Sequence, residues 1–121
     1  MAKILLAEDE ALTARTLREL LAGYGHQVEI VATGAKVLAA VADNRPDLIL
    51  MDISLAGPMN GVEAARQVRV LHPIPIVFIT GYDDQESMKE ALELSKAYIR
   101  KPLSIEILVQ AINSVFVAPD S

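Results

Sequence analysis

Short apolar runs alternate with amphipathic segments along the whole chain. The runs have the length of strands, and we expect strands at Lys3–Ala7, Gln27–Val31, 48–51, 75–79 and 97–100. The third run, Leu48-Ile49-Leu50-Met51, is apolar at every position. Such a run is typical of a strand that is covered on both faces, as the strands of parallel sheets are.

Between these runs, apolar residues recur every three or four positions, which predicts helices with one buried face. Ala14, Leu17 and Leu21 mark the first helix. Gly23 and Gly25 end it. A second helix is expected at 33–42 with Thr33 as its cap, and a third at 62–71. A fourth should begin at a capping-box variant formed by Asp83 and Glu86, and a last helix is expected at 105–115 with Ser104 as its cap. This alternation predicts an α/β fold, a doubly wound five-stranded parallel sheet flanked by five helices.

One domain accounts for a chain of this size. The 121 residues are 52% apolar, so the chain can bury a core and is not intrinsically disordered. We expect a domain over 1–117 and a tail or linker stub at 118–121. The chain has no cysteine, which excludes disulfides and thiolate metal sites and is compatible with the cytoplasmic location that we expect. No apolar run approaches the roughly 18 residues that cross a membrane.

The charge balance is acidic, with 16 Asp and Glu against 11 Lys and Arg and a net charge of −5. Direct nucleic-acid binding is not expected, because it needs a basic patch. The excess acid is either an ordinary solvated surface or a set of carboxylates gathered at one site. The residues at the strand ends bear on this choice.

Reactive side chains follow four of the predicted strands. They are Glu8, Asp9 and Glu10 after the first, Asp52 after the third, Thr80 after the fourth and Lys101 after the fifth. The carboxyl ends of parallel strands meet at one edge of a sheet, where the ligands of doubly wound folds bind. We therefore expect these side chains to converge at a single rim.

Glu8, Asp9 and Asp52 need a cation to share that rim. Two carboxylates 4 Å apart repel by about 4 kcal/mol at an effective dielectric near 20, and Lys101 supplies only one positive charge. Oxygen ligands favour Mg²⁺, or Mn²⁺, so we infer a divalent metal site. The alternative is that the acids before the first helix only stabilise its amino end. Asp52 argues against this alternative, because it follows a wholly apolar strand.

A divalent cation beside a carboxylate, the Thr80 hydroxyl and the Lys101 ammonium suits phosphoryl transfer, because cation and ammonium neutralise the transferring group. A carboxylate can be the nucleophile and form an aspartyl phosphate, and Asp52 is the candidate. Taken alone, Thr80 could cap a turn, Lys101 could be solvated and Tyr98 could pack at a strand edge. Their joint arrangement favours the phosphoryl interpretation.

In this order and spacing the chain resembles the receiver domain of two-component response regulators over nearly its whole length. The resemblance is carried by Glu8-Asp9-Glu10, Asp52-Ile53, Asn60-Gly61-Val62-Glu63-Ala64, Thr80-Gly81, Tyr98 and Lys101-Pro102. It implies the flavodoxin-like receiver fold and Mg²⁺-dependent transfer of a phosphoryl group to Asp52 from the phosphohistidine of a sensor histidine kinase or phosphotransfer protein. It implies a signalling switch that promotes its own phosphorylation and slow dephosphorylation, not an enzyme with an external substrate.

The resemblance also implies roles at the metal site. Asp52 is the phosphoacceptor and, with Asp9, a ligand of the ion, while Glu8 binds it directly or through water. The backbone carbonyl of Ser54 is the remaining protein ligand. Ser54 and Tyr82 flank the path of the hydrolytic water and set the lifetime of the phosphate.

Further implied roles concern the response to phosphate. Thr80 follows the phosphoryl group, Lys101 forms an ion pair with it, and a cis peptide before Pro102 aims the lysine. Tyr98 is the aromatic switch that turns inward when Thr80 moves. The surface of the fourth helix, fifth strand and last helix then controls a downstream protein or output domain, and could also join two copies of the chain.

The chain departs from the family pattern in three segments. The stretch 52–61 is one residue longer than the commonest form and has Ala56 where proline is usual. Gly81 stands where alanine is more usual, and 94–97 lacks the common Gly-Ala. These differences affect the shape of the loops rather than the set of reactive side chains.

Three other functions are less compatible with the residues. A flavodoxin-like electron carrier needs a phosphate-cradling loop after the first strand, where this chain has acids. A phosphatase of the haloacid dehalogenase type places Asp-x-Asp there, whereas Asp52 lies far downstream. A pseudo-receiver, which never takes phosphate, is disfavoured by the intact set of acids.

Overall fold

A five-stranded sheet with helices on both faces builds the molecule. The computed structural model describes residues 2–81, 85–95, 97–101 and 104–116. In chain order the elements are β1 (Lys3–Ala7), α1 (Ala11–Gly23), β2 (Gln27–Val31), α2 (Gly34–Asp43), β3 (Leu48–Asp52), α3 (Gly61–Leu71), β4 (Ile76–Thr80), α4 (Gln85–Leu94), β5 (Tyr98–Arg100) and α5 (Ile105–Phe116).

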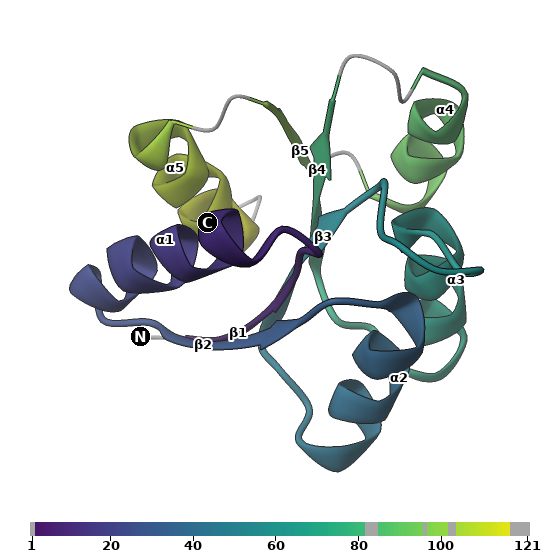
Figure 1. Cartoon of the computed structure of the whole chain (residues 1–121), viewed down its shortest axis with the longest axis horizontal. Helices are drawn as coiled ribbons and strands as arrows, with labels where there is room; N and C mark the ends of the chain where they lie inside the picture. The colour runs from purple at the N-terminus through teal and green to yellow at the C-terminus, as the bar shows by residue number, and fades with distance from the viewer. Residues whose placement is uncertain (1, 82–84, 96, 102–103, 117–121) are drawn as a thin grey trace.

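The strands pair in the order β2-β1-β3-β4-β5, and every neighbouring pair is parallel. Figure 1 shows α1 and α5 on one face of the sheet and α2, α3 and α4 on the other. The predicted doubly wound α/β fold is therefore confirmed. The strand order reverses between β1 and β3, and the carboxyl ends at such a switch point are where doubly wound folds bind ligands.

Two apolar clusters fill the space between the sheet and its helices. Side chains alternate between the two faces of a strand. Leu50 and Val77 accordingly pack on the α1 and α5 side, whereas Met51 and Phe78 pack against α2, α3 and α4. The central strands β3 and β4 are buried along their whole length. The residues that end these two strands are thus held by a close-packed core.

Two strands extend further than their hydrophobic runs predict. β3 includes Asp52, which lies opposite Ile79 in the sheet register. β4 includes Thr80, which lies opposite Arg100. Backbone pairing between strands, which an apolar pattern does not report, adds one polar residue to each. The reactive side chains at these positions are therefore attached to paired strands and not to free loops.

The amino ends of two helices are fixed by side-chain caps. The Thr33 hydroxyl accepts a hydrogen bond from the backbone N–H of Lys36 (3.2 Å), which confirms the predicted cap of α2. The Asn60 side chain accepts one from the backbone N–H of Glu63 (3.0 Å) at the start of α3. Each cap satisfies a backbone donor that has no partner inside the helix.

Some of the predicted organisation lies outside the described residues. This holds for Asp83 of the capping-box variant and for the tail at 118–121. Within the described ranges, none of the helices has both the length and the apolar character that crossing a membrane requires.

Candidate functional site

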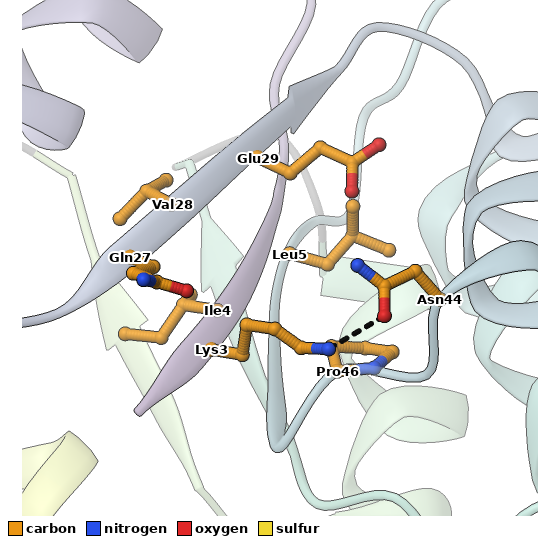
Figure 2. A pocket seen from close by; sticks show the side chains of 8 residues that line it. All are labelled: Lys3, Ile4, Leu5, Gln27, Val28, Glu29, Asn44 and Pro46. Atoms are coloured by element: carbon orange, nitrogen blue, oxygen red, sulfur yellow. Dashed lines mark hydrogen bonds between the residues drawn. The ribbon is translucent and has the colours of Figure 1, made fainter. Parts of the chain in front are cut away.

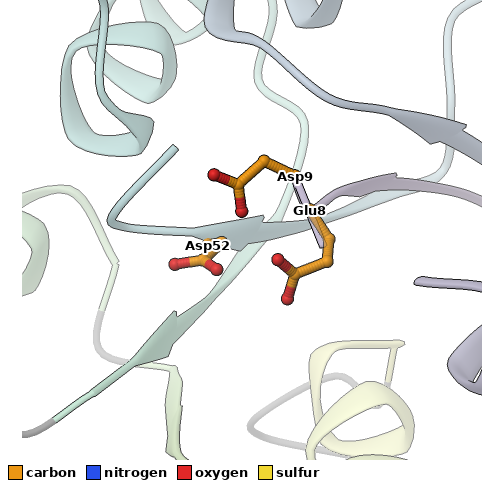
Figure 3. Close-up of side chains that lie close together, drawn as sticks. All are labelled: Glu8, Asp9 and Asp52. Carbon is orange, nitrogen blue, oxygen red and sulfur yellow. The ribbon is translucent and has the colours of Figure 1, made fainter. Parts of the chain in front are cut away.

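Three carboxylates meet at the carboxyl ends of β1 and β3. Glu8 and Asp9 follow β1, and Asp52 ends β3, the neighbouring strand. One oxygen from each side chain lies within 4.8 Å of the other two, and Figure 3 shows them converging. Glu8 and Asp52 are each only 2% exposed, whereas Asp9 is exposed. Two buried negative charges this close together require positive charge nearby.

The alternation of side chains along the strands explains why two of these acids are buried. Asp52 continues the row of Leu48 and Leu50, which face α1 and α5. Glu8 continues the row of Leu6 on the adjacent strand. Both carboxylates therefore continue the same apolar layer at the carboxyl ends of the strands, where the core excludes most water.

Lys101 provides a positive charge at the same edge. Its Nζ donates a hydrogen bond to Oδ2 of Asp52 at 2.9 Å and lies 3.8 Å from Oε1 of Glu8. Its backbone N–H donates to the carbonyl oxygen of Thr80 (2.9 Å), which fixes the lysine against the end of β4. The other Asp52 oxygen, Oδ1, accepts from the backbone N–H of Ser54 at 2.9 Å. Both oxygens of Asp52 are thus held by a donor.

The ion pair with Asp52 outweighs the cost of partly burying the lysine. Burial acts to lower the pKa of Lys101, but the hydrogen bond and the negative charge of Asp52, together with Glu8, raise it above its ordinary value. The ammonium therefore stays protonated at any physiological pH. One positive charge still faces three carboxylates.

Glu8 is the acid that carries the remaining electrostatic cost. Burial raises its pKa to about 7, and the negative charge of Asp52 adds to this effect. Its Oε2 accepts a hydrogen bond from the backbone N–H of Glu10 (3.1 Å). Its Oε1 is buried and, among the described residues, has no hydrogen-bond partner. A buried acceptor without a partner is costly, so this oxygen is poised for another ligand.

This donor set fits a hard divalent cation. The cluster of Glu8, Asp9 and Asp52 offers only oxygen atoms, which Mg²⁺ and Mn²⁺ prefer. The unpartnered Glu8 oxygen lies in the same cluster, and a cation there would lower the pKa of this carboxyl toward its usual range. The residues present are therefore suited to a magnesium site.

Thr80 and Tyr98 lie on the same face of the sheet. Tyr98 is opposite Phe78 in the register of β4 and β5, two residues before the position opposite Thr80. The Thr80 hydroxyl is buried and donates to the carbonyl oxygen of Gly81 (3.1 Å). The Tyr98 side chain is 43% exposed at the edge of the sheet. The two side chains therefore lie on one face of neighbouring strands.

Three other residues named from the sequence are not among the described members of the carboxylate cluster. Tyr82 and Pro102 lie outside the described residues. Glu10 is not part of the carboxylate cluster, and its side chain instead accepts a hydrogen bond from the Thr13 hydroxyl in the first turn of α1. The sequence pattern does not reveal the close approach of Gly61 to the backbone of Asp52; its place between a capping Asn and a helix is the available signal.

A cavity of about 430 Å³ reaches Lys101, the lysine that contacts Asp52. It runs along α1 and is lined by Glu10, Leu12, Thr13, Thr16, Leu17, Leu20 and Lys101. A smaller one of about 160 Å³ lies at the amino ends of β1 and β2, where the Lys3 ammonium donates to Asn44 (2.6 Å), as Figure 2 shows. Only the first of these two shares a residue, Lys101, with the carboxylate site.

The chain is similar to known proteins over most of its length. The sequence model of a family described as "Response regulator receiver domain" matches residues 4–113. Protein PilH of Pseudomonas aeruginosa is 31% identical over 119 residues, which cover 95% of this chain and 98% of PilH. The DNA-binding response regulator MtrA of Mycolicibacterium paratuberculosis is 34% identical over 113 residues, which cover 93% of this chain. The chain therefore spans about half the length of MtrA (50%).

A solved structure shows the same arrangement of elements. The signal receiver domain of a modulated diguanylate cyclase from Desulfovibrio desulfuricans superposes with a TM-score of 0.87 at 33% sequence identity. The match covers 94% of this chain and 92% of that domain. Sequence and fold therefore agree over the segment that carries the carboxylates.

Proposed function

This chain belongs to the response regulator receiver domain family of two-component signalling, and we propose that it is switched by phosphorylation of Asp52. The observation that carries the proposal is the setting of this carboxylate. It is buried at the end of a central strand, its two oxygens are held by the Ser54 amide and the Lys101 ammonium, and two further carboxylates adjoin it.

Glu8, Asp9 and Asp52, with the backbone carbonyl of Ser54, are proposed to hold Mg²⁺ or Mn²⁺. The unpartnered, buried Oε1 of Glu8 supports this assignment. When bound, the ion offsets the negative charge that gathers on the transferring phosphoryl group. The protein's part is to keep these oxygen donors at a fixed rim of the sheet.

Transfer begins with a phosphohistidine presented by a sensor histidine kinase or a phosphotransfer protein. An oxygen of Asp52 attacks phosphorus; the new O–P bond forms as the bond from phosphorus to the imidazole nitrogen breaks, and the bonding electrons remain on that nitrogen. Lys101 exchanges its contact with Asp52 for one with the phosphoryl oxygens, and the Thr80 hydroxyl turns to them from Gly81. The chain thereby takes up its own phosphate and slowly loses it to water, without turning over an external substrate.

The phosphoryl group adds about two negative charges at the rim and shifts the population of two conformations. Thr80 and Tyr98 share a face of the sheet, so their movement would reach the surface made by α4, β5 and α5. That surface exposes the apolar side chains Leu92, Tyr98 and Ile107. We propose it as the contact for a downstream protein, an output domain or a second copy of the chain.

Nucleic acid is not among the partners that we propose for this segment. The net charge of −5 opposes phosphate binding. MtrA is a DNA-binding response regulator, but the chain matches only half of its length. DNA binding is thus a property of that relative as a whole.

Acetyl phosphate tests the proposed function, because it can replace the phosphohistidine and releases acetate on transfer. Incubation with ³²P-labelled acetyl phosphate and Mg²⁺ is expected to label the protein. Excess EDTA is expected to prevent the labelling. A wild-type protein that remains unlabelled with Mg²⁺ present would contradict the proposal.

Magnesium binding is expected to weaken as the pH falls below 7. Burial raises the pKa of Glu8 to about 7, so at lower pH a proton occupies the carboxyl that the ion needs. The ion must displace this proton, and the dissociation constant should rise by about tenfold for each pH unit below the pKa. Titration calorimetry at several pH values, in buffers with different ionisation enthalpies, measures both the affinity and the protons released.

The variant Glu8→Gln is the control for this pH dependence. It removes the titrating carboxyl, so its weaker affinity should stay nearly level between about pH 6 and 8. Equal affinity of the wild-type protein across that range would contradict the expected pH dependence, and wild-type affinity of Glu8→Gln at pH 8 would show that Glu8 does not ligate the ion.

A further inference from the structure

Gly61, the first residue of α3, lies against the peptide group of Asp52. A side-chain carbon at position 61 would overlap the carbonyl oxygen of Asp52 and would lie 2.9 Å from its carbonyl carbon and 3.0 Å from Cγ of Met51. The positive φ angles among the described residues belong to Gly25 and Gly57, so backbone conformation does not explain a glycine at 61. The requirement is one of space alone.

The absence of a side chain at position 61 lets the first turn of α3 pack directly against the end of β3. The backbone N–H of Gly61 donates to the carbonyl oxygen of Ile53 at 3.0 Å. The N–H of Ile53 donates in turn to the carbonyl oxygen of Ile79 in β4, also at 3.0 Å. The peptide that follows Asp52 is therefore clamped between the neighbouring strand and the first turn of a capped helix.

A second glycine holds the far side of the same loop. At Gly34, the first residue of α2, a side-chain carbon would lie 2.9 Å from Cγ of Met59 and 3.0 Å from its carbonyl oxygen. The adjacent residue Thr33 forms a parallel bridge with Ala56. The segment between Asp52 and α3 is thus approached closely by a glycine at two points, the backbone of Asp52 and Met59, where a larger residue would have to displace its neighbour.

We propose that Gly61 and Gly34 are positioning residues for the acceptor carboxylate. They act through the backbone of 52–61 and keep Asp52 in register with Glu8 and Lys101. The proposal rests on the proposed function of Asp52. Misplacing a reacting group by about 1 Å can cost about 100-fold in rate. A methyl group at either position should therefore reduce Mg²⁺ affinity and the rate of phosphorylation by more than the loss of folding stability explains.

The test compares Gly61→Ala with Val62→Ala. Val62 is buried in the same helical turn, so its truncation lowers stability without adding an atom beside Asp52. We expect Gly61→Ala to weaken Mg²⁺ binding by at least about tenfold, to slow labelling by acetyl phosphate by a similar factor, and to shift the NMR signal of the Ser54 amide that donates to Asp52. Val62→Ala should keep both values within about twofold of wild type.

Gly34→Ala provides an independent arm, because its clash is with a flexible side chain. We expect a loss of Mg²⁺ affinity of a few fold, restored in part by Met59→Ala in the same chain, which removes the nearest atom. Gly23→Ala, where a side-chain carbon meets open space, is the control for replacing a helical glycine.

The outcomes separate the two proposals. Folded Gly61→Ala, or Gly34→Ala should the first not fold, with wild-type Mg²⁺ affinity and labelling would overturn the positioning role while leaving the proposed function intact. A wild-type chain that neither binds Mg²⁺ nor takes up label would overturn the proposed function itself. An impaired Gly34→Ala that Met59→Ala does not rescue would contradict the role proposed for Gly34, whose close contact is with Met59.

Discussion

Replacing Asp52 with Asn is expected to reduce labelling by acetyl phosphate to background. The substitution is nearly isosteric, so the strand pairing and the hydrogen bond from the Ser54 amide to the side-chain oxygen can persist. The amide lacks the negative oxygen that attacks phosphorus, and no covalent aspartyl phosphate can form. Labelling followed by treatment with hydroxylamine, which cleaves acyl phosphates, measures this loss.

Asp9→Asn is the matched control for this prediction. It removes the same charge from the same cluster but leaves the acceptor intact, and Asp9 is exposed, so its loss costs the fold little. We expect it to raise the Mg²⁺ concentration needed for labelling while excess Mg²⁺ restores part of the rate. Hydroxylamine-labile phosphate on Asp52→Asn would show that another residue accepts the phosphoryl group.

The sequence alone predicts that Glu8 and Asp52 lie at the same edge of the sheet, because of one geometric fact about parallel sheets. Their strands end at a common edge, so residues that follow apolar runs meet there even when they are far apart in the chain. Glu8 and Asp52 are separated by more than 40 residues in the printed sequence, yet oxygens of the two side chains lie within 4.8 Å. The short distance itself depends on β1 and β3 being neighbours in the sheet, which the apolar pattern does not give.

The finer features of the site depend on distances that a pattern does not contain. The contact of Lys101 with Asp52 and the raised pKa of Glu8 both follow from side-chain positions in a buried layer. Gly61 is similar: the sequence shows a glycine after a capping residue, but not that the backbone of Asp52 occupies the space beside it. Such packing arises only when separate elements are brought together.

Lys101→Met is the substitution expected to separate binding of the ion from transfer. The side chain keeps its apolar stem but loses the ammonium that contacts Asp52 at 2.9 Å. Removing one preorganised positive group from a site of phosphoryl transfer should slow labelling by about 10²–10³-fold. Mg²⁺ binding should instead tighten several-fold, because a competing cation leaves Asp52 and Glu8. A destabilised fold would weaken both quantities together, so opposite changes identify an electrostatic role.

The folding stability of Lys101→Met gives a further check on this prediction, although solvent screening limits the expected loss. Leaving a buried carboxylate without its partner typically costs about 3–5 kcal/mol, but the Lys101 side chain is 41% exposed, so water screens part of the change and the loss should be smaller. Added Mg²⁺ should recover it, as measured by urea unfolding at pH 8 with and without the ion. Lys3→Met, which removes an equal charge at the opposite end of the sheet, should leave labelling unchanged. Wild-type labelling of Lys101→Met would mean that the ammonium only balances charge in the resting protein.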